Sequence, residues 1–98
     1  MIVIREVFYL KFGAAKPALA LIKKGKELMR EFSKTPMKTM TDLTGHSYTL
    51  VMESEYENLT VFEKEMQKGF SDSKWQKWYE KFKPLVESSY REIFKIVE

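Results

Sequence analysis

Residues 2–12, with the sequence IVIREVFYLKF, decide the fold. Side chains alternate across a β-strand, so this segment predicts two distinct faces. One face carries Ile2, Ile4, Glu6, Phe8, Leu10 and Phe12, and the other carries Val3, Arg5, Val7, Tyr9 and Lys11. Because both faces hold large apolar side chains, we expect other parts of the structure to cover both of them.

A helix is predicted over residues 16–32, after a break at Gly13. Pro17 suits the first turn, where its missing N–H costs nothing. Apolar positions recur at helical spacing at Ala18, Leu21, Ile22, Gly25, Leu28, Met29 and Phe32. Gly25 lies on this stripe, where glycine costs about 1 kcal/mol relative to alanine. We attribute it to a close approach of the helix to the sheet.

Residues 37–44 and 47–55 predict a β-hairpin whose two-residue turn is Gly45-His46. Glycine at the first turn position suits a type II′ turn. This turn sets a register in which Met40 faces Val51 and Lys38 faces Glu53. One register thus gives an apolar pair and an opposite-charge pair, which supports it.

Two further helices are predicted after the hairpin. The first covers residues 58–68, with Asn58 as its cap and Gly69 as its stop. The second begins at a serine cap, either Ser71 or Ser73, and cannot continue through Pro84. Its apolar face consists of Trp75, Trp78, Tyr79 and Phe82.

Residues 89–97 predict a last strand, which completes the order β-α-β-β-α-α-β. This order is the split β-α-β pattern of a ferredoxin-like α+β domain with a four-stranded antiparallel sheet. Right-handed crossovers place the helices on one face of that sheet. The other face is apolar, and an exposed patch of that kind usually marks an interface. We therefore expect residues 1–98 to form one domain that pairs sheet to sheet with a second copy, as a dimeric α/β barrel.

The stretch Phe8-Tyr9-Leu10-Lys11-Phe12-Gly13 resembles the first strand of NIPSNAP-like proteins, which carry an aromatic-x-Leu-Lys-Pro-Gly pattern. Phe8, Leu10, Lys11 and Gly13 match this pattern, whereas Phe12 stands where the family usually has proline. That family belongs to the dimeric α/β-barrel superfamily, so the resemblance implies the same fold. The superfamily includes cofactor-free monooxygenases, haem-degrading enzymes, isomerases and regulatory ligand-binding domains, and the resemblance therefore does not choose a function.

Composition argues against metal sites and bound cofactors. The chain has no cysteine, which excludes disulfides and thiolate metal sites. A site built on the single histidine, His46, would need carboxylates around it, and only Asp42 is near in sequence. The haem-degrading relatives need a histidine on a helix, and no predicted helix carries one. We expect no metal, no haem and no other cofactor.

Charge and hydropathy predict a cytoplasmic protein without a nucleic-acid or membrane partner. The formal net charge is only +3, and glutamates are interleaved with the lysines, so no basic face is predicted. No stretch approaches the roughly 20 apolar residues that span a bilayer. Arg5 and Glu6 interrupt the first apolar run, so we predict no signal peptide.

His46 is a weak candidate for a catalytic residue. Its imidazole suits proton transfer near neutral pH. The alternative is an ordinary polar residue in a turn. The sequence does not fix whether the hairpin tip brings His46 to a pocket.

The aromatic residues Trp75, Trp78 and Tyr79 predict either core packing or the edge of a ligand pocket between helices and sheet. Tyr9 and Tyr48 would add hydroxyl groups from the sheet. Three functions stay open: a homodimer that binds a small apolar or aromatic molecule, a cofactor-independent monooxygenase or isomerase acting on an aromatic or quinone-like compound, and a structural dimerisation module.

Overall fold

The computed structural model describes residues 1–97 and has the predicted order of elements. The strands are β1 (Ile2–Leu10), β2 (Met37–Thr41), β3 (Thr49–Tyr56) and β4 (Val86–Lys95). The helices are α1 (Ala15–Met29), α2 (Leu59–Phe70) and α3 (Ser73–Phe82), and a short 3₁₀ turn, η1 (Lys83–Leu85), leads into β4. The strands form one antiparallel sheet in the order β2-β3-β1-β4. The prediction of a ferredoxin-like α+β fold is thus confirmed.

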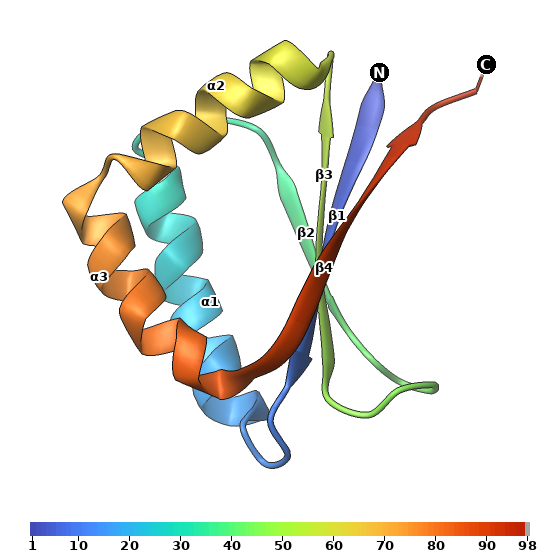
Figure 1. Ribbon diagram of the computed structural model, residues 1–98, viewed down its shortest axis with the longest axis vertical. Coiled ribbons are helices and arrows are strands. Elements are labelled where there is room, and N and C mark those ends of the chain that lie inside the picture. Colours follow the sequence, from blue (N-terminus) through green and yellow to red (C-terminus); the bar gives the residue numbers. More distant parts are fainter. Residues whose placement is uncertain (98) are drawn as a thin grey trace.

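Helices α1, α2 and α3 lie on the same side of the sheet, and no described element covers the other side (Figure 1). Strand alternation divides the side chains between these two sides. We call the uncovered side the open sheet face. Its residues are Val3, Arg5, Val7, Tyr9, Lys38, Met40, Thr49, Val51, Glu53, Glu55, Ser88, Tyr90, Glu92 and Phe94.

The core fills the space between the helices and the sheet in two clusters. The larger one is buried and consists of Leu10, Ala18, Ile22, Leu50, Trp78 and Phe82. The smaller one consists of Ile4, Tyr56 and Phe62, at the end of the sheet that α2 covers. The apolar residues at helical spacing in the helices and at alternating positions in the strands therefore pack together in this layer.

The predicted hairpin register is confirmed, but its turn is wrong. Met40 faces Val51 and Lys38 faces Glu53. The strands separate after Thr41, however, and residues 42–48 form a longer loop. The reason is the side chain of Asp42, whose Oδ1 accepts a hydrogen bond of 2.9 Å from the backbone N–H of Thr49 and so ends the ladder early.

The cap of α2 is confirmed and the cap of α3 is corrected. The Asn58 side chain accepts from the Val61 N–H at 3.0 Å. Helix α3 is capped by Asp72 rather than by a serine, because its carboxylate accepts from the N–H groups of Lys74 and Trp75. Gly69 does not stop α2, which continues to Phe70.

Gly25 marks a close approach of α1 to α3, not to the sheet as the sequence suggested. A Cβ at this position would lie 2.8 Å from two ring atoms of Trp78. The indole cannot easily move away, because its N–H donates to the backbone oxygen of Leu21. The Trp78 ring therefore occupies the space that a side chain at position 25 would need.

We predict that Gly25→Ala destabilises the protein, although alanine is the better helix former by about 1 kcal/mol. Overpacking of this kind costs about 1–3 kcal/mol, so the melting temperature should fall. Gly69→Ala is the matched control, since its Cβ would meet only the Phe32 ring at 3.2–3.3 Å, a looser contact. A rise in melting temperature for Gly25→Ala would contradict this account of the contact.

Candidate functional site

A small cavity lies among the ends of α1, α2 and α3 and has a volume of about 40 Å³. We call it the aromatic cavity. It is lined by Met29, Phe32, Ser33, Tyr56, Glu65, Met66, Gly69, Phe70 and Trp75. A single water needs about 10–15 Å³ by this kind of measure, so the cavity holds a group of several atoms. Phe70 is 58% exposed and therefore forms part of its rim.

Glu65 supplies the polar end of the aromatic cavity. Its Oε2 accepts a hydrogen bond of 2.7 Å from the Ser33 hydroxyl, and the Thr35 hydroxyl lies 3.2 and 3.3 Å from its two oxygens. Ser33 is buried, and its oxygen also accepts from the Thr35 N–H at 3.2 Å. Within residues 1–97, no cationic side chain forms an ion pair with Glu65. The carboxylate is thus held in place by neutral donors.

Tyr56 shares this end of the cavity. Burial raises the pKa of its phenol, and the negative charge of Glu65 raises it further. The Tyr56 hydroxyl therefore stays protonated well above neutral pH. Its ring packs edge to face on Phe62, with centroids 5.2 Å apart, and this contact anchors it in the smaller core cluster.

Stacked rings form the wall of the aromatic cavity. Trp75 stacks on Trp78 with centroids 4.6 Å apart, and Trp78 stacks on Phe82 at 5.0 Å. Phe32 meets Trp75 almost at a right angle, with centroids 6.3 Å apart. Two aromatic walls at a right angle present π-surface to a guest from more than one direction.

A second cluster of protic side chains lies on the open sheet face. His46 stacks on Tyr9 with centroids 4.1 Å apart. The His46 Nδ1 lies 3.0 Å from the backbone oxygen of Ser47, which can only accept. This contact favours the neutral tautomer that has its proton on Nδ1 and leaves Nε2 as an acceptor. The Tyr9 and Tyr90 rings are 5.9 Å apart, and a hydrogen bond with Tyr9 raises the pKa of Tyr90.

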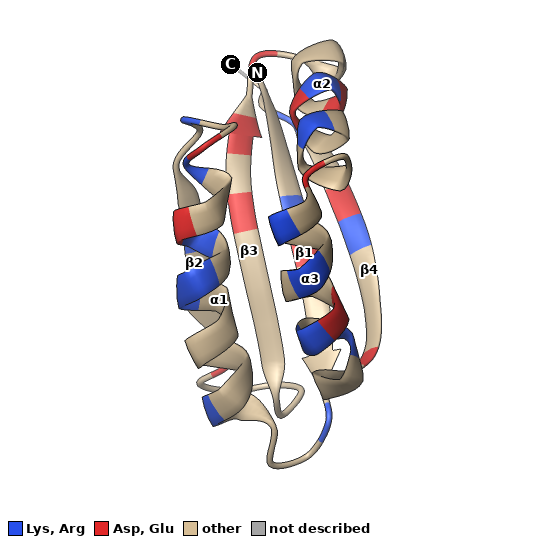
Figure 2. Ribbon diagram, turned by 90° about the vertical axis from the view of Figure 1, so that its left-hand side faces the viewer, with Lys and Arg blue, Asp and Glu red and all other residues tan. Residues whose placement is uncertain are grey.

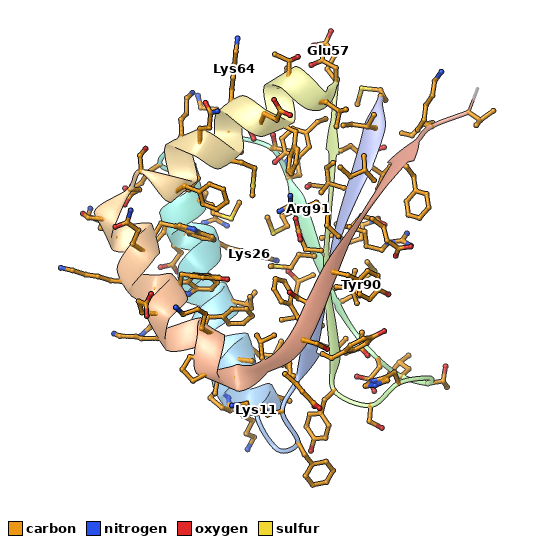
Figure 3. The ribbon with its side chains drawn as sticks, in the orientation of Figure 1. Lys11, Lys26, Glu57, Lys64, Tyr90 and Arg91 are labelled. Carbon is orange, nitrogen blue, oxygen red and sulfur yellow. The ribbon has the colours of Figure 1, made fainter. Side chains whose placement is uncertain are left out.

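The charged residues of β1 are paired on both sides of the sheet. On the open sheet face, Arg5 donates to Glu53 at 2.7 and 3.1 Å, which raises the arginine pKa, and its guanidinium lies 5.4 Å from the Phe94 ring centre. On the helix side, Arg91 pairs with Glu6. Figure 3 shows Arg91 pointing toward the helices and Tyr90 pointing away from them.

The structure does not bring the predicted site residues together in one pocket. Tyr9 and His46 come together, but on the open sheet face, with the sheet between them and the aromatic cavity. The physical reason is strand alternation, which directs Tyr9 away from the helix-facing Phe8. His46 follows Tyr9 because the loop of residues 42–48 folds onto that face.

The other four candidates do not share one site either, although Trp75 and Trp78 stack on each other. Trp75 lines the aromatic cavity. Trp78 is buried in the larger core cluster. Tyr48 packs against that cluster and beside Phe12, with ring centroids 5.0 Å apart. Tyr79 is 45% exposed and has the Lys83 ammonium 5.7 Å above its ring.

Sequence reasoning did not identify Ser33, Tyr56 or Glu65 as site residues. Glu65 left a usable signal, because it lies three residues after Phe62 and next to Met66, on the apolar stripe of α2. A charged residue on an apolar helix stripe indicates a polar contact in the interior. Ser33 left none, since a serine after a helix is ordinary.

Residues 1–97 contain no group of three or more His, Asp or Glu side chains arranged to hold a metal ion. No helix in the described part of the chain combines the length and the apolar character required to cross a membrane.

Solved structures identify the fold, whereas no protein-family model and no curated protein matches the sequence. A NIPSNAP family protein from Agrobacterium tumefaciens has a TM-score of 0.92 at 18% identity, over 99% of this chain and 86% of that one. An uncharacterised NIPSNAP domain protein from Burkholderia xenovorans has a TM-score of 0.90 at 14% identity, over 99% and 95% of the two chains. A cofactor-independent oxygenase from Streptomyces nogalater has a TM-score of 0.74 at 8% identity, over 99% and 93%. The predicted resemblance to NIPSNAP-like proteins is thus confirmed at the level of the fold.

The raised pKa of Tyr56 predicts a pH dependence of stability. The folded protein holds this proton more tightly than the unfolded chain, so the stabilisation is complete below the unfolded pKa, about 10. It is lost as the pH rises through the higher folded pKa. The free energy of unfolding should therefore fall as the pH rises above about 10, and Tyr56→Phe should remove the part of this fall that comes from the Tyr56 phenol.

Glu65→Gln provides the matched variant, because it removes the charge that adds to the shift. In a titration followed by tyrosinate absorbance, the Tyr56 step should then move to lower pH. Tyr90 also has a raised pKa, and the Tyr90→Phe variant separates its contribution. Identical titration curves for the wild type and Tyr56→Phe would contradict the assignment.

Proposed function

We propose that this protein is a homodimer that binds a small apolar or aromatic molecule in the aromatic cavity. The observation that carries the proposal is the cavity itself, a void of about 40 Å³ with walls that include Phe32 and Trp75 and with Glu65 at one end. Ligand sites are typically concave and apolar, with a few polar groups that fix orientation. The void is far smaller than the roughly 300 Å³ of a common ligand pocket. One end of the ligand would therefore enter it, while the remainder lies against Phe70 at the rim.

The open sheet face supports the homodimer. Tyr90 and Phe94 are each 45% exposed there, beside the half-buried Val51. Arg5 and Glu53 neutralise each other, so covering this pair would not bury an isolated charge. A second copy of the same sheet offers the same apolar surface in return, as a two-fold interface requires.

Cofactor-independent turnover is the second candidate function, either as a monooxygenase or as an isomerase of an aromatic or quinone-like compound. Two observations favour it: the fold shared with the Streptomyces oxygenase, and the His46 Nε2 that is left as an acceptor beside Tyr9. A general base needs such an acceptor within reach of a substrate proton. This chemistry would take place at the open sheet face, whereas binding alone would use the aromatic cavity.

The homodimer is tested by Tyr90→Glu. Burying an unpaired carboxylate in the interface costs several kcal/mol, and each 1.4 kcal/mol is about tenfold in affinity. Sedimentation at tens of micromolar should give twice the chain mass for the wild type and mostly monomer for this variant. Leu19→Glu is the control, because Leu19 is an exposed residue of α1, on the helix side, and should leave the dimer intact. A monomeric wild type would overturn the proposal.

Ligand binding is tested by titrating the protein with benzyl alcohol. We expect a saturable change in tryptophan fluorescence, and calorimetry should show affinity reduced at least about tenfold in Trp75→Leu, which removes a cavity wall. Tyr79→Leu, on the same helix but outside the cavity, should bind normally.

A measurement of catalytic turnover distinguishes the binding function from the enzymatic one. If oxygen uptake with a quinol substrate depends on His46 but not on Trp75, the enzymatic candidate replaces the binding one. If aromatic probes neither bind nor react, the chain is a structural dimerisation module instead.

A further inference from the structure

We propose that the aromatic cavity binds an organic cation, with the ammonium end of the ligand against Glu65. The inference rests on the proposed function and names the chemical class of its ligand. A neutral aromatic guest would use the walls alone. The charge and position of Glu65 indicate a guest that also carries a positive charge.

The first step is the state of the carboxylate. Glu65 is half-buried, and the donors beside its oxygens are the neutral hydroxyl groups of Ser33, Thr35 and Tyr56. A carboxylate offers about four acceptor positions, so beside these three hydroxyl groups one position remains for a further donor. Taking a carboxylate out of water without a cation is unfavourable, and a bound cation would relieve that cost.

The second step is the aromatic lining. Phe32, Tyr56, Phe70 and Trp75 line the same void as Glu65. Aromatic faces attract cations within about 6 Å of the ring centre, and sets of such rings recognise quaternary and methylated ammonium groups. The perpendicular arrangement of Phe32 and Trp75 supplies two differently oriented walls. A carboxylate and several rings around one void form a complete set of contacts for an alkylammonium group.

The third step is size. A void of about 40 Å³ accepts a compact head group of a few heavy atoms but not a bicyclic ring. A trimethylammonium group is larger than this void, so part of it would lie at the rim beside Phe70. The organic part of the ligand would then extend past Phe70 to the surface.

Basic side chains are also near and limit the affinity. Arg30, Lys34 and Lys68 line an open depression on the other side of Glu65, with a volume of about 460 Å³. None of the three forms an ion pair with Glu65 within residues 1–97. They lie toward solvent, where salt screens their repulsion of a cation. Removing the charge at Lys68 should therefore strengthen cation binding slightly.

The experiment compares choline with 3,3-dimethylbutan-1-ol, which has the same shape without the charge. Calorimetric titration of the full chain should show choline binding at least about tenfold more tightly. Glu65→Gln keeps the side-chain size and should abolish this preference. Glu63→Gln, an exposed glutamate of α2 outside the cavity, is the matched control and should retain it.

Each outcome decides between the inference and the proposed function. Equal binding of the two probes overturns the cation inference and leaves binding in the cavity intact. A preference for choline that persists in Glu65→Gln also overturns it, because the cation then binds elsewhere. If choline, its neutral analogue and benzyl alcohol all fail to bind, the proposed function itself fails. Should Glu65→Gln unfold, Phe32→Leu keeps the carboxylate and must weaken choline more than the neutral alcohol; equal weakening overturns the inference.

Discussion

The contact between the Trp78 indole and Gly25 is the constraint on which the rest of the helix layer depends. Only a residue without a side chain lets α3 approach α1 closely enough for the indole to lie between them. Trp78 then serves as a stacking surface on both sides, for Trp75 toward the aromatic cavity and for Phe82 toward the sheet. Phe82 in turn meets Phe8 of β1 edge to face. One glycine thus connects the position of the cavity wall to the central strand.

The central strand is subject to a second constraint, because it must be compatible with two different environments. Its adjacent charges, Arg5 and Glu6, point to opposite sides of the sheet. Glu53 of β3 neutralises the first and Arg91 of β4 neutralises the second. Each side of the sheet is therefore balanced in charge by a cross-strand neighbour. This arrangement lets helices cover one side and leaves the other suitable for a second sheet.

The parts of the fold that depend on periodicity could be predicted, and the parts that depend on one side chain could not. Apolar spacing and the pairing of Met40 with Val51 are repeated signals, and they fixed the element order and the register. The loop of residues 42–48 and the start of α3 depend on single aspartates, Asp42 and Asp72, which compete with equally plausible neighbours. The aromatic cavity is harder still, because its members come from several elements whose distances no local pattern encodes.

The outer surface of the helices and the aromatic cavity carry charges of opposite sign, and this difference affects which ligands can bind. Lysines and arginines dominate the outward sides of α1 and α3, away from the sheet (Figure 2). The aromatic cavity has a carboxylate instead, so a cation is attracted to the cavity rather than to the basic helix surface. His46 is on the far side of the sheet and cannot exchange a proton with a guest there. Among the described residues that line the cavity, Glu65 is the acidic group that a charged guest would meet, and its carboxylate accepts hydrogen bonds from the Ser33 and Thr35 hydroxyls. A half-buried carboxylate beside aromatic rings can hold a charged group, and the only histidine lies beyond its reach, which favours binding over turnover in the cavity.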